Sequence, residues 1–256
     1  MNGTVQSSRV VILVKALPNP STKHQETVCC AGVTLDGQWK RLFPIRFRQL
    51  SDQVAFKRWD WVEFQYSKSS DPRVESCRVH EESINRLSPL HKNERAAFLD
   101  RMIIGSANEA ASLGKSLALI RPRDTLFHWV KKTDQELEGE RQHFSEVSRQ
   151  KSLIDPELAK IEPTPYKFYF NFTDNSGKHQ YENGDWESHA MFAKWRAEYS
   201  EARALKLMSD VFNEQYPKSG MAFAIGTLYK RPHQWTLLGV LRLDLLTQED
   251  LFGLGN

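Results

Sequence analysis

The chain has 256 residues, of which 40% are hydrophobic and 26% are charged, and its formal net charge is +3 at pH 7. This composition excludes an intrinsically disordered chain, and the length suffices for one large domain or two small ones. This small net charge does not by itself indicate a polyanionic partner. Only a local cluster of basic residues would be evidence for one.

The three cysteines are Cys29, Cys30 and Cys77, which are too few and too unevenly spaced for a disulfide framework or a zinc ribbon. We therefore expect reduced thiols and a cytoplasmic protein. The longest apolar run, residues 10–14, is too short to cross a membrane, and we expect no membrane partner. The polar N-terminus before it lacks the pattern of a secretory signal peptide.

Strands dominate the first part of the chain. The continuous β-rich run at residues 10–15 predicts a buried strand. Residues 27–34 and 38–43 flank Asp36-Gly37, the tight-turn signal of a hairpin. Further strands are expected at 59–66, 74–79, 116–120 and 125–131, and helices at 92–103 and 106–113. This part is therefore expected to form a mostly antiparallel sheet or small β-barrel with one or two helices.

Residues 133–160 are rich in Glu, Gln, Lys, Arg and Ser, which is typical of a solvated helix or linker. The alternating aromatic residues of 166–173 then predict a strand. Asp185 can cap a helix that begins at Trp186 and could extend to about residue 215. Two more strands are expected at 221–228 and 235–243.

These elements predict an α+β fold in three parts. Residues 1–132 are expected to form a basic β-rich domain, 133–160 a charged linker or helix, and 161–256 a β-α-β-β domain.

The most conspicuous segment is basic and aromatic, Arg41-Leu-Phe-Pro-Ile-Arg-Phe-Arg48. In a strand, Arg46 and Arg48 would share one face and Phe47 would lie on the other. Arginine binds phosphate oxygens in a bidentate fashion, and aromatic rings stack on unpaired bases. An edge strand with solvated arginines explains the pattern equally well. The candidate nucleic-acid-binding residues are Arg41, Arg46, Arg48, Lys57, Arg58, Lys230 and Arg231.

A second constellation lies near a turn and a helix start. His179, Asp185 and Glu187 could carry general acid–base catalysis, and Asp60 is a fourth candidate. The favoured interpretation is structural, with Asp185 capping the helix and Glu187 complementing its dipole. The histidine spacing is not diagnostic of a metal site. The phosphate-loop, dinucleotide and nucleophile-elbow motifs are absent, so we expect no cofactor.

Several segments together resemble a family of uncharacterised bacterial proteins. They are Thr27-Val-Cys-Cys-Ala-Gly-Val-Thr34, the stretch from Trp39 to Arg48, Asp71-Pro-Arg-Val-Glu-Ser76 and Asp185-Trp-Glu187. The resemblance spans most of the chain. It implies an association with mobile or defence regions, and hence a nucleic-acid target. Members carry a cysteine and histidine cluster before the Trp-Glu element, of which this sequence keeps only His179.

The sequence therefore predicts a protein that binds or processes DNA or RNA, with the resemblance implying a role in bacterial defence. One alternative is a hydrolase, either a nuclease or a glycosylase that extrudes a modified base into a pocket. Another is a protein–protein adaptor, because seven tryptophans and fourteen phenylalanines could supply interface anchors.

Overall fold

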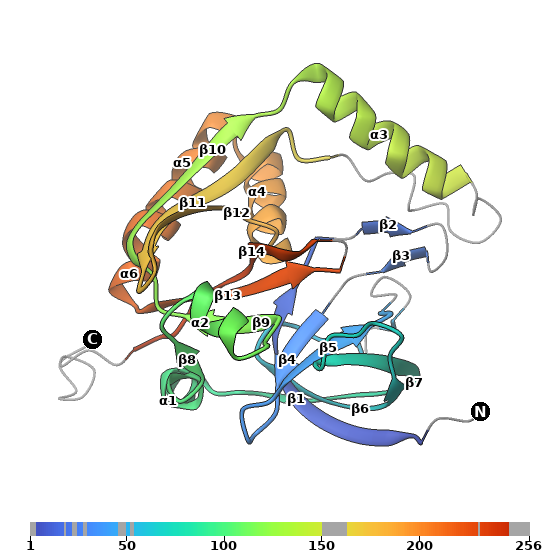
Figure 1. Ribbon diagram of the computed structural model, residues 1–256. Coiled ribbons are helices and arrows are strands. Elements are labelled where there is room, and N and C mark those ends of the chain that lie inside the picture. Colours follow the sequence, from blue (N-terminus) through green and yellow to red (C-terminus); the bar gives the residue numbers. More distant parts are fainter. Residues whose placement is uncertain are drawn as a thin grey trace.

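The computed structural model describes residues 4–17, 19–21, 25–27, 30–45, 50–51, 54–149, 163–229 and 231–245 (Figure 1). It confirms the predicted α+β class, with antiparallel sheets and a small β-barrel. No helix in these ranges is long and apolar enough to span a membrane.

Five strands of the first part form a closed barrel. They are β1 (Gln6–Lys15), β4 (Cys30–Val33), β5 (Trp39–Phe43), β6 (Asp60–Lys68) and β7 (Ser76–Pro89). Around the barrel they follow the order β1-β4-β5-β7-β6, and β6 closes on β1. All neighbours are antiparallel except β5 and β7, which are parallel. This Greek-key order is that of an OB-fold barrel.

Two sequence expectations for this barrel are confirmed. The β-rich run at 10–15 lies within β1 and is buried throughout, and β4 and β5 form the hairpin across Asp36-Gly37. Gly37 has a φ of +84°, a conformation that side chains with a Cβ rarely adopt. A second hairpin, β2 (Asn19–Ser21) with β3 (Gln25–Thr27), lies in the β1–β4 connection.

The strands from β8 to β14 form two sheets around one core. Their strands are β9 (Leu117–Ile120), β10 (Arg123–Lys131), β11 (Tyr166–Asp174), β12 (Gly177–Glu182), β13 (Met221–Leu228) and β14 (Arg231–Arg242), with β8 (Ile103–Ile104) parallel to β9 at one edge. One sheet has the order β10-β11-β12, and the other has the order β14-β13-β9-β8.

The two sheets repeat the strand order of the first barrel. Only Arg121 and Pro122 separate β9 from β10, so the two act as one bent strand that pairs with β13 at its start and β11 at its end. The parallel bridge between Asn183 and Leu237 brings the end of β12 beside β14. Counted in chain order, the third and fifth strands are thus parallel neighbours in both barrels. We therefore describe the second unit as a second OB-type barrel.

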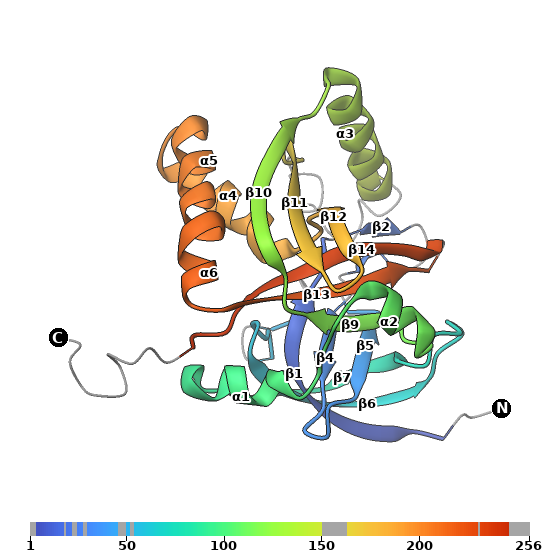
Figure 2. The same ribbon diagram turned by 60° about the vertical axis from the view of Figure 1, so that its left-hand side comes forward.

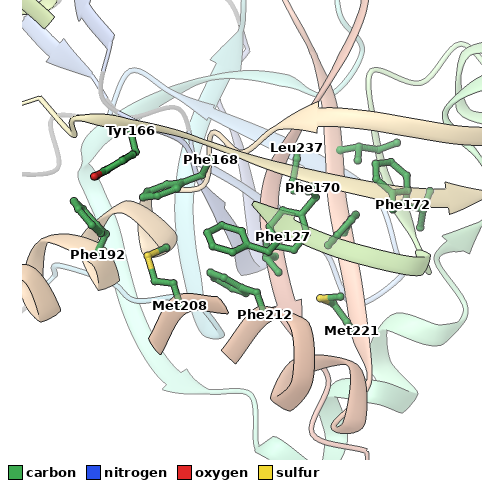
Figure 3. Packing of buried hydrophobic residues seen from close by; sticks show 14 of the residues in the cluster. Phe127, Tyr166, Phe168, Phe170, Phe172, Phe192, Met208, Phe212, Met221 and Leu237 are labelled. Carbon is green, nitrogen blue, oxygen red and sulfur yellow. The ribbon is translucent and has the colours of Figure 1, made fainter. Parts of the chain in front are cut away.

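Helices lie between the third and fourth strands of the second barrel. They are α4 (Trp186–Glu198), α5 (Glu201–Asp210), the π-helical turn η4 (Val211–Gln215) and α6 (Tyr216–Lys218). Phe192, Met208 and Phe212 from these helices pack on the inward phenylalanines of β10 and β11, as Figure 3 shows. The single helix expected from Trp186 is interrupted after Glu198, because Ser200 caps a new helix through its side chain.

The other helices are short or lie at the periphery. They are η2 (Lys92–Glu94), α1 (Arg95–Asp100), α2 (Ala107–Ser112) and α3 (Asp134–Arg149). The helix expected at 92–103 ends at Asp100, since Ile103 instead pairs with Leu119 in the sheet. Strand β12 was not expected. The predicted boundary at 133–160 stays a prediction, although β9 and β10 before it pair with strands that follow it.

A third apolar cluster joins the barrels. In β1, Val10 and Ile12 point into the first barrel, whereas Val11 and Leu13 belong to the cluster between the barrels. Both faces of β1 are therefore buried, which explains its continuous apolar run. Residues of β4, β9, β13 and β14 complete the cluster. Figures 1 and 2 show β13 and β14 between the first barrel and the β10-β11-β12 sheet.

A buried polar network fastens the same contact. Arg41 of β5 is 4% exposed, and its Nη2 donates to the carbonyl oxygens of Ser116 (2.7 Å) and Thr227 (3.3 Å). Glu75, also buried, accepts from the backbone nitrogen and the hydroxyl of Ser116, each at 2.9 Å. Arg73 donates to the Thr227 carbonyl at 2.7 Å. The outer side of β5 therefore binds the second barrel through Arg41.

Replacing Arg41 with alanine should destabilise the protein strongly. The change removes a buried charged donor from the carbonyl groups of Ser116 and Thr227, at a cost of about 2–3 kcal/mol. Chemical denaturation measures the loss of unfolding free energy. The matched control is Arg78→Ala on β7, where the arginine is exposed. Equal effects of the two substitutions would contradict the role given to Arg41.

His189 of α4 should make stability fall in mild acid. Burial lowers its pKa to about 4, although Nε2 lies 3.0 Å from the Asn183 carbonyl oxygen. As the pH falls, His189 therefore binds a proton near pH 6.5 in the unfolded chain but only near pH 4 in the folded chain. Stability from this group is complete above pH 6.5 and is lost as the pH falls toward 4.

Denaturation of His189→Gln between pH 7 and pH 4 checks this expectation. The unfolding free energy of the wild type should drop by roughly 2 kcal/mol more than that of the variant over this window. His233→Gln serves as the control, because His233 is exposed. Parallel pH curves for the wild type and His189→Gln would refute the assignment.

Candidate nucleic-acid interface

Strand β11 separates the core of the second barrel from an outer sheet surface. Phe168, Phe170 and Phe172 are at most 2% exposed and point into the core (Figure 3). Successive side chains of a strand point to opposite faces, so Lys167, Tyr169 and Asn171 lie on the outside. We call the outer surface of β10, β11 and β12 the sheet face. It comprises Leu126, His128, Val130, Lys167, Tyr169, Asn171, Thr173, Lys178, Gln180 and Glu182.

An aromatic pair occupies the middle of the sheet face. His128 of β10 is the register partner of Tyr169 of β11, and their rings stack with centroids 5.5 Å apart and planes 18° from parallel. Glu182 of β12 lies opposite Tyr169. Partial burial, together with this carboxylate, raises the pKa of the Tyr169 hydroxyl. The hydroxyl therefore stays protonated, and the pair is a half-buried aromatic stack on the sheet face.

Amides form the neighbouring row. Asn171 of β11 and Gln180 of β12 are register partners, and Gln180 Nε2 donates to Asn171 Oδ1 at 3.0 Å. Leu126 of β10 completes this row and is 51% exposed, while Val130, on the other side of His128, is 53% exposed. These two apolar side chains therefore lie on either side of His128 on the sheet face.

Cations border the sheet face. Lys178 of β12 is exposed opposite Thr173. Arg123, at the start of β10, donates to the Asp174 carbonyl at 3.0 Å and remains exposed. Lys167 forms an ion pair with Glu136 of α3, and this contact lowers the pKa of Glu136 to about 2. The sheet face thus combines stacking surface, amides and positive charge.

The expected nucleic-acid-binding residues are scattered. Arg46, Arg48 and Lys230 lie outside the described residues. Arg41 is buried between the barrels, as described above. Arg231 is exposed at the start of β14 and lies 3.3 Å from Gln234 Oε1. Lys57 is exposed and precedes Arg58, whose guanidinium faces the second barrel.

Asp185 and Glu187 meet basic residues of the first barrel at the start of α4. Asp185 is 1% exposed, pairs with Arg58 and accepts from the backbone nitrogens of Glu187 (3.2 Å) and Val240 (3.1 Å). Asp185 therefore does cap the helix, as the sequence indicates. Glu187 Oε1 lies 2.7 Å from Lys15 Nζ.

The charge of Glu187 follows from these neighbours. Partial burial alone would raise the pKa of its carboxyl, but Arg58 and Lys15 outweigh burial and hold the pKa below its ordinary value. Glu187 is therefore ionised at neutral pH.

The other two catalytic candidates have partners of their own. Asp60 is buried and accepts from Arg86 Nε at 2.8 Å and from the Lys57 backbone nitrogen at 2.8 Å. His179 Nε2 lies 2.8 Å from Asp174 Oδ1, and its ring packs on Phe172. Within the described residues no group of three or more His, Cys, Asp or Glu side chains could hold a metal ion.

Two family models cover nearly the whole chain. The model described as "Domain of unknown function (DUF8758)" matches residues 6–102, which contain the first barrel. The model described as "Domain of unknown function (DUF8757)" matches residues 101–254, more than half of the chain. The chain belongs to the DUF8757 family. The region matched by DUF8757 contains the entire sheet face.

Other comparisons add little. No curated protein matches the chain. Among solved structures the chain is similar to "Structure and Conformational Change of a Replication Protein A Heterotrimer Bound to ssDNA", with 10% identity and a TM-score of 0.23. The match covers 98% of this chain and 68% of that chain. A similarity this low carries no argument about fold or function.

The sequence contained a signal for the sheet face. The alternation of residues 166–173 places Lys167, Tyr169 and Asn171 on the face of the strand opposite the phenylalanines, but it does not indicate a function for them. Residues 177–182 carry a second alternation, with Lys178, Gln180 and Glu182 exposed between less exposed residues. This pattern of small, polar and aromatic residues has no apolar stripe, which is why a strand was not expected there.

Proposed function

We propose that this protein binds single-stranded nucleic acid across the sheet face. The observation that carries the proposal is the stacked pair His128–Tyr169 on the second barrel. It lies on the outer surface of that barrel's first two strands, beside the third. OB-type barrels bind oligonucleotides on the surface around their second and third strands.

The chemistry of the sheet face suits an unpaired strand. Bases of a single strand stack on exposed aromatic rings, and each stacked base contributes about 1–3 kcal/mol. Lys178 and Arg123 at the border can neutralise phosphate groups. A duplex hides its base faces, so the stacked pair of Tyr169 and His128 favours single strands.

The equivalent surface of the first barrel is not available to a ligand. Ala31 and Val33 of β4 belong to the apolar cluster between the barrels, and Arg41 of β5 is buried in the polar network. The first barrel therefore supports the second, and we place the nucleic-acid site on the second barrel alone.

Hydrolysis of the nucleic acid stays a prediction from the sequence. Asp185, Glu187 and Asp60 each already form an ion pair, His179 lies 2.8 Å from Asp174 Oδ1, and within the described residues no hydrogen bond or ion pair links all four into one site. A role in bacterial defence likewise stays a prediction. The choice between DNA and RNA is an outcome of the binding experiments.

Tyr169→Ala should weaken binding without unfolding the protein. Loss of one stacked base lowers affinity about 5- to 100-fold. Fluorescence anisotropy with labelled oligothymidylate and oligouridylate of about 16 nucleotides, the upper range for one OB barrel, measures the effect. Tyr199→Ala is the control, because Tyr199 is 50% exposed at the end of α4, away from the sheet face. Equal affinities for the two variants, or no binding by the wild type at low salt, would overturn the proposal.

Lys178→Ala should reduce the salt dependence of binding. For single strands, the logarithm of affinity falls with the logarithm of salt concentration by about 0.7 per neutralised phosphate, so one lost contact should flatten the slope by about that amount. Titrations at several salt concentrations give the slope. Lys206→Ala on α5, where the lysine pairs with Asp210, is the control. An unchanged slope for Lys178→Ala would remove Lys178 from the phosphate path.

A further inference from the structure

The amide row of the sheet face has a defined orientation. Asn171 Oδ1 accepts from Gln180 Nε2 at 3.0 Å and lies 3.3 Å from His128 Nε2. Gln180 Nε2 also lies 3.3 Å from His128 Nε2. The Gln180–Asn171 hydrogen bond occupies the oxygen of one amide and the nitrogen of the other, and His128 Nε2 either donates to that oxygen or accepts from that nitrogen, depending on its tautomer.

The same contacts leave two complementary groups. Within the described part of the chain, Asn171 Nδ2 and Gln180 Oε1 have no hydrogen-bond partner, although both side chains are held in place by their other ends. Asn171 Nδ2 can only donate and Gln180 Oε1 can only accept. The sheet face therefore presents one donor and one acceptor from two hydrogen-bonded amides, next to the stacked pair of His128 and Tyr169.

A donor beside an acceptor is what the Watson–Crick edge of an unpaired base requires. Each base carries both kinds of group on that edge, and single-stranded recognition uses this edge together with stacking. In a duplex the edge is already paired. The distance along β11 from Tyr169 to Asn171 is one side-chain repeat, about 7 Å, so a base bound there would neighbour the stacked one.

We propose that Asn171 and Gln180 bind the Watson–Crick edge of one unpaired base and make the site select among bases at that position. His128 is a positioning residue, because its Nε2 donates to Asn171 Oδ1 in one tautomer and accepts from Gln180 Nε2 in the other. The proposal rests on the proposed function and adds base selection to it.

Four homo-oligomers of about 12 nucleotides, one for each base, test base selection by anisotropy. The wild type should bind the favoured oligomer at least about fivefold more tightly than the weakest one, since a bidentate amide contact discriminates by this much or more. Asn171→Ala and Gln180→Ala should each reduce that ratio at least threefold while changing the affinity for the weakest oligomer less than twofold. Asn85→Ala, an exposed amide on β7 of the first barrel, should keep the wild-type ratio.

The outcomes separate this proposal from the binding proposal. Binding of all four oligomers with equal affinity, or an equal loss for all four in Asn171→Ala and Gln180→Ala, overturns base selection and leaves binding intact. A ratio that persists unchanged in both variants assigns the preference to stacking and also overturns base selection. Absence of binding by the wild type to every oligomer at low salt overturns the proposed function itself.

Discussion

The contact between the two barrels is the constraint on which the rest of the structure depends. It buries the outer side of β1 and β4 against β9, β13 and β14, and it places the guanidinium of Arg41 against the carbonyl groups of Ser116 and Thr227. A Cβ added at Gly239 of β14 would lie 3.3 Å from the Leu13 carbonyl oxygen of β1, and one added at Gly226 of β13 would lie 3.1 Å from Arg41 Nη2. The two barrels therefore approach each other closely at these glycines, in addition to the apolar burial.

Because of this contact, the two similar barrels use the same surface in different ways. In an OB-type barrel the surface around the second and third strands is the usual ligand surface. The first barrel uses that surface to bind the second barrel, whereas on the second barrel Tyr169 and its neighbours remain partly exposed. The ion pairs Arg58–Asp185 and Lys15–Glu187 reinforce the same contact at the start of α4. Asp185 and Glu187, two of the four catalytic candidates from the sequence, therefore take part in the docking of one barrel on the other.

The sequence predicted what depends on neighbours along the chain. The apolar run of β1, the Asp36-Gly37 hairpin and the alternation in β11 are local patterns, and each was correctly placed. Burial of Arg41 could not be predicted, because its partners Ser116 and Thr227 are 75 and 186 residues away. The same holds for β9 and β10, which look like separate strands in the sequence yet act as one bent strand linking two sheets.

In the candidate site, too, the sequence predicted local features but not contacts between distant residues. The outward position of Lys167, Tyr169 and Asn171 followed from alternation alone, but their meaning depends on what lies beside them. Stacking requires His128 from β10, and the amide pair requires Gln180 from β12, a strand that the sequence did not indicate. An exposed tyrosine on a single strand predicts nothing specific. The same tyrosine, stacked on an imidazole and next to a hydrogen-bonded amide pair, is the basis on which we propose recognition of an unpaired base.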